Sequence, residues 1–220
     1  MARGLERREA EEILRLCIDE KSMRKGQNYL TVLGDPERGR VLDVCETRRT
    51  EAVRSMLRTA LDGKARERVE SVTMDMWEPF MTAVRLELPR ADTVHDRFHV
   101  TMHLNNAVDR TRRRENRRLS KRGIDDLKGS KHLFLRNRDD LRPESLDHFA
   151  RAREASRDTA TTWRFKEFFR GFLDCFDMPE ARHFLASWYT LARKEALPEL
   201  TGVAKTILRH AKGILAYITH

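Results

Sequence analysis

Three aspartates follow short apolar runs of the kind that form β-strands. Asp19 follows the run at residues 14–18, Asp75 follows the run at 69–74, and Asp96 follows a further short run. Carboxylate oxygens are the ligands that magnesium prefers, and this ion usually takes one or two carboxylates together with phosphate oxygens of the substrate. If two of these strand ends are neighbours, the sequence predicts a metal site that can act on a phosphodiester.

The segment between Asp75 and Asp96 predicts how these two acids are positioned. Its apolar residues recur at helical spacing, Pro79 falls in the tolerated first turn of the helix, and Pro89 ends it. The apolar residues are Trp77, Phe80, Met81, Val84 and Leu88. A strand–helix–strand unit pairs its strands in parallel with a right-handed crossover, so both strand ends reach one edge of the sheet. Ligand sites of open α/β sheets gather at that edge.

The residues before this unit predict the rest of an α/β fold with a mixed sheet. The nearly continuous apolar run at 14–18 indicates a central strand that is buried on both faces. Residues 29–33 and 40–45 are typical of two strands joined by a hairpin turn. Thr50 is expected to cap a helix that ends near Gly63.

The local pattern also has a plainer interpretation, in which the three aspartates are solvated strand ends or helix caps. Periodicity alone does not distinguish this interpretation from a metal site. His99 and His103, four residues apart and close to Asp96, suggest zinc in the same way, but no fourth ligand accompanies them. We therefore interpret them as polar helix residues near the predicted edge, and Trp77 as a packing residue.

The composition favours a nucleic-acid partner. The chain has 220 residues with a formal net charge of +9, and 40% of its residues are hydrophobic, which is enough for a core. It contains no apolar run long enough to cross a membrane, and its N-terminus does not resemble a signal peptide. Its three cysteines are widely spaced and form no CxxC pair, which argues against a disulfide framework or a zinc ribbon. We expect a cytoplasmic protein.

The second half of the chain predicts helices only, and it begins with a strongly basic segment. The basic residues are Arg110, Arg112, Arg113, Arg114, Arg117, Arg118, Lys121 and Arg122. The charge density favours contact with the DNA backbone, which would not depend on base sequence; the alternative is a solvated helix face. Aromatic and aliphatic stripes at 163–176, 181–191 and 200–215 indicate an all-helical subdomain that packs on itself.

Several stretches occur in one order along the chain. They are Ile18-Asp19-Glu20 followed by Arg24, Lys25, Gly26 and Tyr29; Gly39 to Leu42 running to Arg48; Met74-Asp75-Met76; Leu88 to Ala91; Asp96 to Val100; and Asn105 to Arg113. Together these stretches resemble the DDE-type transposases of bacterial insertion sequences, specifically the ISL3 family. The likeness continues more weakly through the helical part to Leu215.

This resemblance implies a ribonuclease H-like catalytic core over residues 1–100 and a helical insertion region with the basic arm over residues 101–220. It also implies cleavage and strand transfer of DNA at transposon ends, dependent on Mg²⁺ or Mn²⁺. Carried over by position, Asp19 and Asp75 would be the catalytic metal ligands, with supporting roles for Asp96 and His99. The resemblance further implies a homo-oligomer that associates with the nucleoid.

The chain also departs from the family pattern. Members end the catalytic set with a glutamate on a helix after the insertion, just beyond a segment like residues 208–217, and that position falls past His220. Glu195 and Glu199 precede the expected position, and the N-terminal zinc-binding and helix-turn-helix segments have no match here. We therefore expect an internal piece of a transposase that is inactive alone. The alternative is a non-catalytic remnant that binds DNA or transposase subunits.

Overall fold

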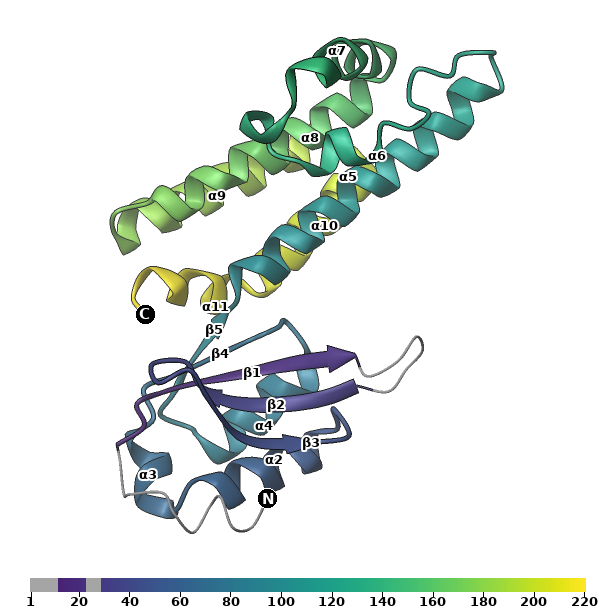
Figure 1. Ribbon diagram of the computed structural model, residues 1–220. Helices are drawn as coiled ribbons and strands as arrows, with labels where there is room; N and C mark the ends of the chain where they lie inside the picture. Colours follow the sequence, from purple (N-terminus) through teal and green to yellow (C-terminus); the bar gives the residue numbers. More distant parts are fainter. Residues whose placement is uncertain (1–11, 23–28) are drawn as a thin grey trace. The chain divides into compact units, whose positions relative to one another are not determined.

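The computed structural model describes residues 12–22 and 29–220, which divide into two compact units (Figure 1). The sheet unit contains the described residues up to Asp96 together with Lys212–His220, and the helical unit is Arg97–Ala211. The sequence analysis assigned the C-terminal end of the chain to the helical region. In the structure, Lys212–His220 instead group with the sheet.

The sheet has five strands in the order β3-β2-β1-β4-β5. They are β1 (Arg15–Ser22), β2 (Tyr29–Asp35), β3 (Arg40–Cys45), β4 (Ser71–Met74) and β5 (Asp92–His95). The pairs β1–β2 and β2–β3 are antiparallel, whereas β1–β4 and β4–β5 are parallel. This confirms the predicted mixed α/β sheet with β1 at its centre. Residues 24–26 of the family resemblance lie outside the described residues.

Helices cover one face of this sheet. The helical segments of the unit are α2 (Thr50–Ala60), α3 (Gly63–Arg68), α4 (Glu78–Glu87), α11 (Ala211–Leu215) and η4 (Ala216–Ile218). Because side chains alternate along a strand, Leu16 and Ile18 point to the same face, and both are buried against residues of α2 and α4. Asp19, the next residue along β1, is exposed.

Three local predictions in this unit need correction. Thr50 is the first residue of α2 and not its cap, because the extended residue before the helix is Arg49. The short helix α3 was not predicted, since the signal for it is a single cap: the Asp62 carboxylate accepts the Ala65 N–H at 2.7 Å. Trp77, interpreted as a packing residue from its helical spacing, is 38% exposed and is not buried in the core.

The C-terminal segment packs against β5 within the sheet unit. An added Cβ at Gly213 would come within 2.5 Å of the His95 ring, so only glycine allows α11 to approach this closely. At the end of the segment, His220 Nε2 lies 3.3 Å from Asp92 Oδ2. These contacts join residues that are more than a hundred positions apart in the sequence, which is why the sequence analysis missed them.

The helical unit is built around one long helix, α5 (Arg97–Ser120), which packs against α6, α8 and α10 (Figure 1). The other segments are α6 (Lys131–Leu135), η1 (Arg138–Asp140), η2 (Pro143–Ser145), α7 (Leu146–Ala155), α8 (Arg157–Phe169), η3 (Arg170–Asp174), α9 (Met178–Lys194) and α10 (Pro198–Arg209). No helix in the described part of the chain combines the length and the apolar composition needed to cross a membrane.

The aromatic stripe forms the core of this unit, as predicted. Trp163, Phe165, Phe169 and Trp188 are buried, and Trp188 Nε1 donates a hydrogen bond to the Phe165 carbonyl at 3.0 Å. The prediction fails at two positions: Phe168 on α8 is 44% exposed, and Phe176 is 93% exposed because the helix has already ended. The buried members of the stripe therefore serve packing and are not available for stacking on nucleic-acid bases.

A buried lysine closes the C-terminal end of α6. Lys166 Nζ donates hydrogen bonds to the carbonyls of Phe134, Leu135 and Arg136 at 3.3, 3.2 and 2.7 Å, and forms an ion pair with Glu167. These carbonyls belong to the last turn of a helix, which leaves acceptors unsatisfied and favours a positive charge. Burial lowers the pKa of the Lys166 ammonium, and its hydrogen bonds attach α6 to α8.

Candidate functional site

The three predicted aspartates follow a single row of the parallel ladder. Ile18 pairs with Met74, and Met74 pairs with His95, on three neighbouring parallel strands. Asp19, Asp75 and Asp96 are the next residues on these strands, so all three occur at the same edge of the sheet. The backbone therefore brings together acids that are far apart in the sequence: Asp19 and Asp75 are 56 positions apart, and Asp75 and Asp96 are 21 positions apart.

Short hydrogen bonds orient two of these carboxylates. Asp19 Oδ1 accepts the Glu20 N–H at 2.8 Å, and Asp75 Oδ1 accepts the Met76 N–H at 2.6 Å. Asp19 is exposed and Asp75 is half-buried, so the pair lies at a surface that a large substrate can reach. Asp96 is half-buried, and its own N–H donates to the Met74 carbonyl at 3.2 Å, extending the β4–β5 ladder by one bond.

The donor set at this edge suits a hard cation. Asp75 directly follows β4, whereas Asp19 lies within β1, which continues to Ser22 and does not end at Asp19 as predicted. Two carboxylates on adjacent strands match the one or two that magnesium usually takes from protein. Among the residues that the structure describes, no group of three or more His, Cys, Asp or Glu side chains is arranged to hold a metal ion. An ion held by Asp19 and Asp75 would therefore have to obtain its other ligands from substrate and water.

His99 lies in the first turn of α5, in the helical unit. It is half-buried and packs edge-to-face with Phe98, with ring centroids 5.6 Å apart. The structure thus groups Asp19, Asp75 and Asp96 in one unit and places the fourth predicted site residue in the other.

One cluster at the aspartate edge was not found from the sequence. The Arg48 guanidinium lies 4.6 Å from the ring centroid of Tyr29 and 4.8 Å from that of Trp77, and Arg48 Nη1 is 3.3 Å from Glu20 Oε2. The family resemblance includes Tyr29, Arg48 and Glu20, but the helical spacing of Trp77 indicates only a packing role. An aromatic residue directly after a strand-end acid was the signal that could have identified the cluster.

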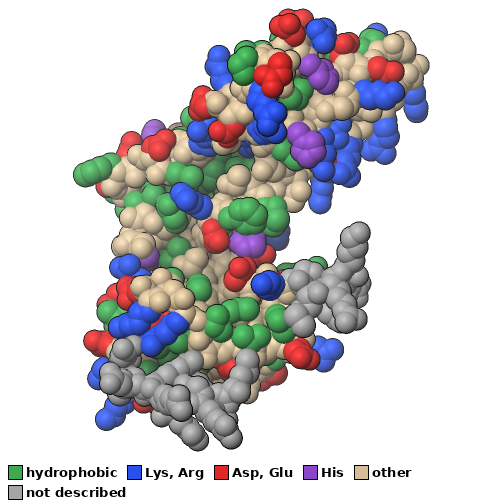
Figure 2. Space-filling model, in the orientation of Figure 1, with side chains coloured by type: hydrophobic (Ala, Val, Ile, Leu, Met, Phe, Trp, Pro, Cys, Tyr) green, Lys and Arg blue, Asp and Glu red, His purple; other side chains and the backbone are tan. Residues whose placement is uncertain are grey.

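The eight basic residues of the predicted arm divide into two groups. Arg112 and Arg113 pair with Asp109, Arg118 pairs with Glu115, and Arg114 pairs with Glu115, Asp158 and Glu199. The others, Arg110, Arg117, Lys121 and Arg122, are exposed and make no ion pair with another described residue. Figure 2 shows Lys and Arg side chains gathered where Figure 1 draws the second half of α5. Fewer charges are available for phosphate contact than the sequence suggests.

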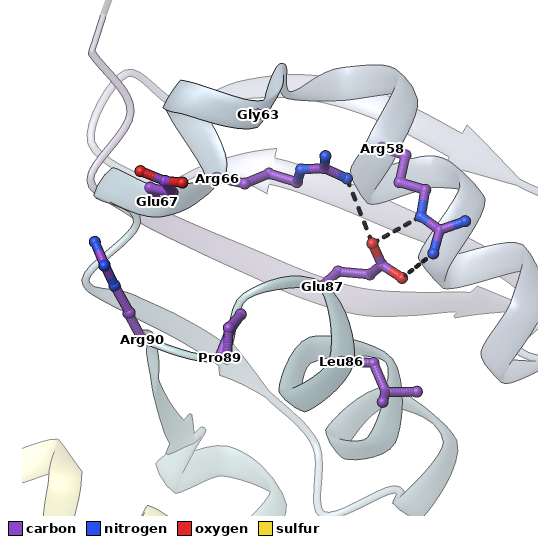
Figure 3. Close-up of a pocket in the computed structure, with 8 residues that line it drawn as sticks. All are labelled: Arg58, Gly63, Arg66, Glu67, Leu86, Glu87, Pro89 and Arg90. Carbon is purple, nitrogen blue, oxygen red and sulfur yellow. Dashed lines mark hydrogen bonds and ion pairs between the residues drawn. The ribbon is translucent and has the colours of Figure 1, made fainter.

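A second charged cluster lies at the C-terminal end of α4, beside a cavity of about 660 Å³ (Figure 3). Glu87 accepts hydrogen bonds from Arg58 Nε and Nη2 and from Arg54 Nε, all at 2.7 Å, and from Arg66 Nη1 at 3.4 Å. The Glu87 side chain is only 5% exposed. Because α4 leads back toward the start of β5, this cluster lies at the end of the sheet opposite Asp75, and its bonds connect α2, α3 and α4.

We expect Glu87→Gln to lower the free energy of unfolding by about 2 kcal/mol at neutral pH, since charge-assisted hydrogen bonds are lost. The hydrogen bond from Arg58, more than any other contact, lowers the pKa of the Glu87 carboxyl. A lowered pKa stabilises the fold above the ordinary carboxyl pKa, and the stabilisation is lost as the pH falls through the folded-state value. Urea denaturation at several pH values should therefore show the difference from the unaltered chain shrinking below about pH 4.

Glu78→Gln, at the exposed N-terminal end of the same helix, is the control and should change stability by less than about 0.5 kcal/mol. If the free energy of unfolding lost in Glu87→Gln stays the same as the pH falls, the ionised carboxylate is not the source of the stabilisation.

Comparison with known proteins shows which family this chain resembles over most of its length. The family model for ISL3-type DDE transposases, described as Transposase, matches residues 16–220. The transposase for insertion sequence element IS1001 from Bordetella parapertussis is 28% identical over 211 residues, which cover 93% of this chain and 51% of that protein. The chain thus spans about half the length of this relative, and no solved structure is significantly similar. Because the family model matches nearly all of the chain, the chain belongs to the ISL3 transposase family.

Proposed function

We propose that the sheet unit is the ribonuclease H-like catalytic core of a DDE-type transposase, and that the helical unit is an insertion in it. The strand order supports this proposal, since three antiparallel strands precede two parallel ones. The chain order supports it too, because Arg97–Ala211 lies between β5 and a C-terminal segment that groups with the sheet. The substrate is DNA at transposon ends, and the reaction is metal-dependent cleavage and strand transfer.

In this proposal Asp19 and Asp75 hold the divalent ion, Mg²⁺ or Mn²⁺. The observation that carries the assignment is the pairing of Ile18 with Met74. Asp19 and Asp75 directly follow these two residues, so they lie next to each other on adjacent strands. A bound ion would polarise the phosphate and lower the pKa of the attacking water or hydroxyl. Asp19 and Asp75 would fix the position of this ion, and Asp96 and His99 have supporting roles. With two carboxylates, the chain alone should bind metal and show little or no strand transfer.

We expect Asp75→Asn and Asp19→Asn each to weaken Mn²⁺ binding at least tenfold. Each change removes one of two anionic ligands while keeping the size of the side chain, and the ion depends on that charge. Isothermal titration with Mn²⁺ in metal-free buffer measures the affinity. Asp174→Asn, an exposed aspartate of the helical unit, removes the same charge and should leave the affinity unchanged. Unchanged Mn²⁺ affinity in Asp75→Asn would exclude this site.

Activity is tested separately by nicking of supercoiled plasmid in Mg²⁺ or Mn²⁺. We expect no nicking above that of Asp75→Asn, because in-line displacement depends on a completely defined coordination geometry. Strong nicking that disappears in Asp75→Asn would show that two carboxylates suffice and that the expected inactivity is wrong.

A second candidate function is DNA binding without catalysis. The exposed basic residues at the end of α5 favour it, since phosphate contacts supply most non-specific affinity. A chain that binds duplex DNA but shows no aspartate-dependent Mn²⁺ binding would have this function.

A further inference from the structure

The two proposed metal ligands lie just beyond the ladder that joins their strands. The parallel pairing of β1 with β4 runs from Arg15–Ser71 to Ile18–Met74 and ends there. Asp19 and Asp75 are the first residues past the last pair. The backbone of β1 and β4 therefore brings the two carboxylates to one edge, but these two strands share no ladder bond at the carboxylates themselves.

Arg48 bridges the two segments at this point. Its guanidinium forms an ion pair with Glu20, which directly follows Asp19, at 3.3 Å. The same guanidinium lies over the ring of Trp77, two residues after Asp75, at 4.8 Å from the centroid. One side chain thus contacts both chain segments immediately beyond the aspartates.

A third contact fixes the guanidinium against the neighbouring strand. Arg48 lies 4.6 Å from the ring centroid of Tyr29, the first residue of β2, which pairs with the last residue of β1. A planar guanidinium can stack on aromatic rings and still donate hydrogen bonds to a carboxylate in its own plane. Lysine has no such plane, so the contact geometry specifies arginine.

The exposure of the cluster argues against a role in stability alone. The Arg48 side chain is 41% exposed and Trp77 is 38% exposed. Ion pairs and cation–π contacts at this exposure contribute little to folding. A large aromatic residue that remains half in water, next to a candidate metal ligand, is better explained by what it positions.

We propose that Arg48 is a positioning residue, which sets the separation of Asp19 and Asp75 by holding Glu20 and Trp77 together. The inference rests on the proposed metal-binding function of the aspartate pair. Arg48 acts through its neighbours and is not itself a metal ligand, because its guanidinium is always positively charged.

The test compares Arg48→Gln, Arg48→Lys and Arg49→Gln. Arg49 is the adjacent, exposed arginine without a side-chain capping bond, and its replacement removes the same charge. We expect Arg48→Gln to weaken Mn²⁺ binding about tenfold, as loss of an outer contact to metal ligands does. Arg48→Lys, which keeps the charge and part of the cation–π contact, should recover part of the affinity. Arg49→Gln should match the unaltered chain.

Two further measurements separate positioning from general destabilisation. The melting temperature of Arg48→Gln should stay within about 2 °C of the unaltered chain, since the lost contacts are exposed. The electron paramagnetic resonance spectrum of bound Mn²⁺ should change in Arg48→Gln and not in Arg49→Gln. Trp77→Leu should reproduce the loss of affinity, because it removes the other end of the link.

The outcomes distinguish this inference from the proposed function. If the unaltered chain binds Mn²⁺ through Asp75 and Arg48→Gln binds it equally well, the positioning role is excluded while the metal site remains. If Arg49→Gln loses as much affinity as Arg48→Gln, general charge explains the effect and the inference is again excluded. If the unaltered chain shows no Asp75-dependent binding, the proposed function fails and the inference fails with it.

Discussion

Replacing Arg114 by leucine should lower the free energy of unfolding of the helical unit by about 3 kcal/mol. Arg114 lies on α5 and contacts three carboxylates: Glu115 at 2.8 Å, Glu199 of α10 at 3.0 Å and Asp158 of α8 at 3.1 Å. One guanidinium therefore joins the three helices that form the centre of the unit. The hydrogen bond that Arg114 donates to Glu199, more than its other contacts, raises the pKa of Arg114, so the pairing persists through the neutral range.

The expected cost comes from the carboxylates that remain. Glu115 is only 1% exposed and Glu199 is 15% exposed, so their charges are largely removed from water. Breaking a buried pair by removing one partner costs about 3 to 5 kcal/mol, and the lower value applies because Arg114 itself is 37% exposed. Leucine has a helix propensity similar to that of arginine and keeps an apolar stem. The free energy lost in Arg114→Leu therefore reports on the charge contacts.

Urea denaturation followed by tryptophan fluorescence measures this change. Two of the three tryptophans, Trp163 and Trp188, are buried in the helical unit and report on it. Arg113→Leu is the matched control, since Arg113 is 62% exposed and, within the described part of the chain, pairs only with Asp109 of its own helix. It should cost less than about 1 kcal/mol. Equal losses in the two variants would show that Arg114 makes no special contribution to the packing of α5, α8 and α10.

The local sequence was sufficient to predict the aspartate edge. An apolar run predicts a strand, and a helix of about ten residues between two strands requires a parallel crossover, so the two strand ends share an edge. Asp75 and Asp96 follow from this rule alone. Asp19 needed one further inference, that its central strand is the neighbour of the strand before Asp75, and the Ile18–Met74 pair confirms that inference.

Ion pairing could not be predicted in this way. The basic segment contains eight basic residues and only two acids, Asp109 and Glu115, and only such nearby acids are visible in a linear pattern. Two of the three acids that pair with Arg114 lie 44 and 85 residues away and meet it only after the helices pack. The same limitation explains Trp77, whose helical spacing is correct but whose position before the first turn of α4 leaves it exposed. Periodicity identifies the elements but not the residues at their boundaries.

The division of the arm changes which residues we expect to contact DNA. Changing Arg117, Lys121 and Arg122 together to glutamine should lower the affinity for duplex DNA of arbitrary sequence about 500-fold at 0.1 M salt, since each phosphate contact contributes about eightfold there. These residues are exposed at the end of α5 and in the turn that follows, and none forms an ion pair with a described residue. Their charges are thus available for phosphate, whereas those of Arg112 and Arg114 are already neutralised by carboxylates.

Fluorescence anisotropy of a labelled duplex, titrated between about 50 and 200 mM salt, measures both affinity and its salt dependence. The slope of log K against log salt should become shallower by about 2.7, which is 0.9 for each of three lost contacts. The matched variant changes Arg151, Arg182 and Lys194 of α7 and α9, which are also exposed, and removes the same three charges. If the affinity and the slope fall by the same amount in both triple variants, DNA binding depends on the net charge of the chain, and the end of α5 has no particular role.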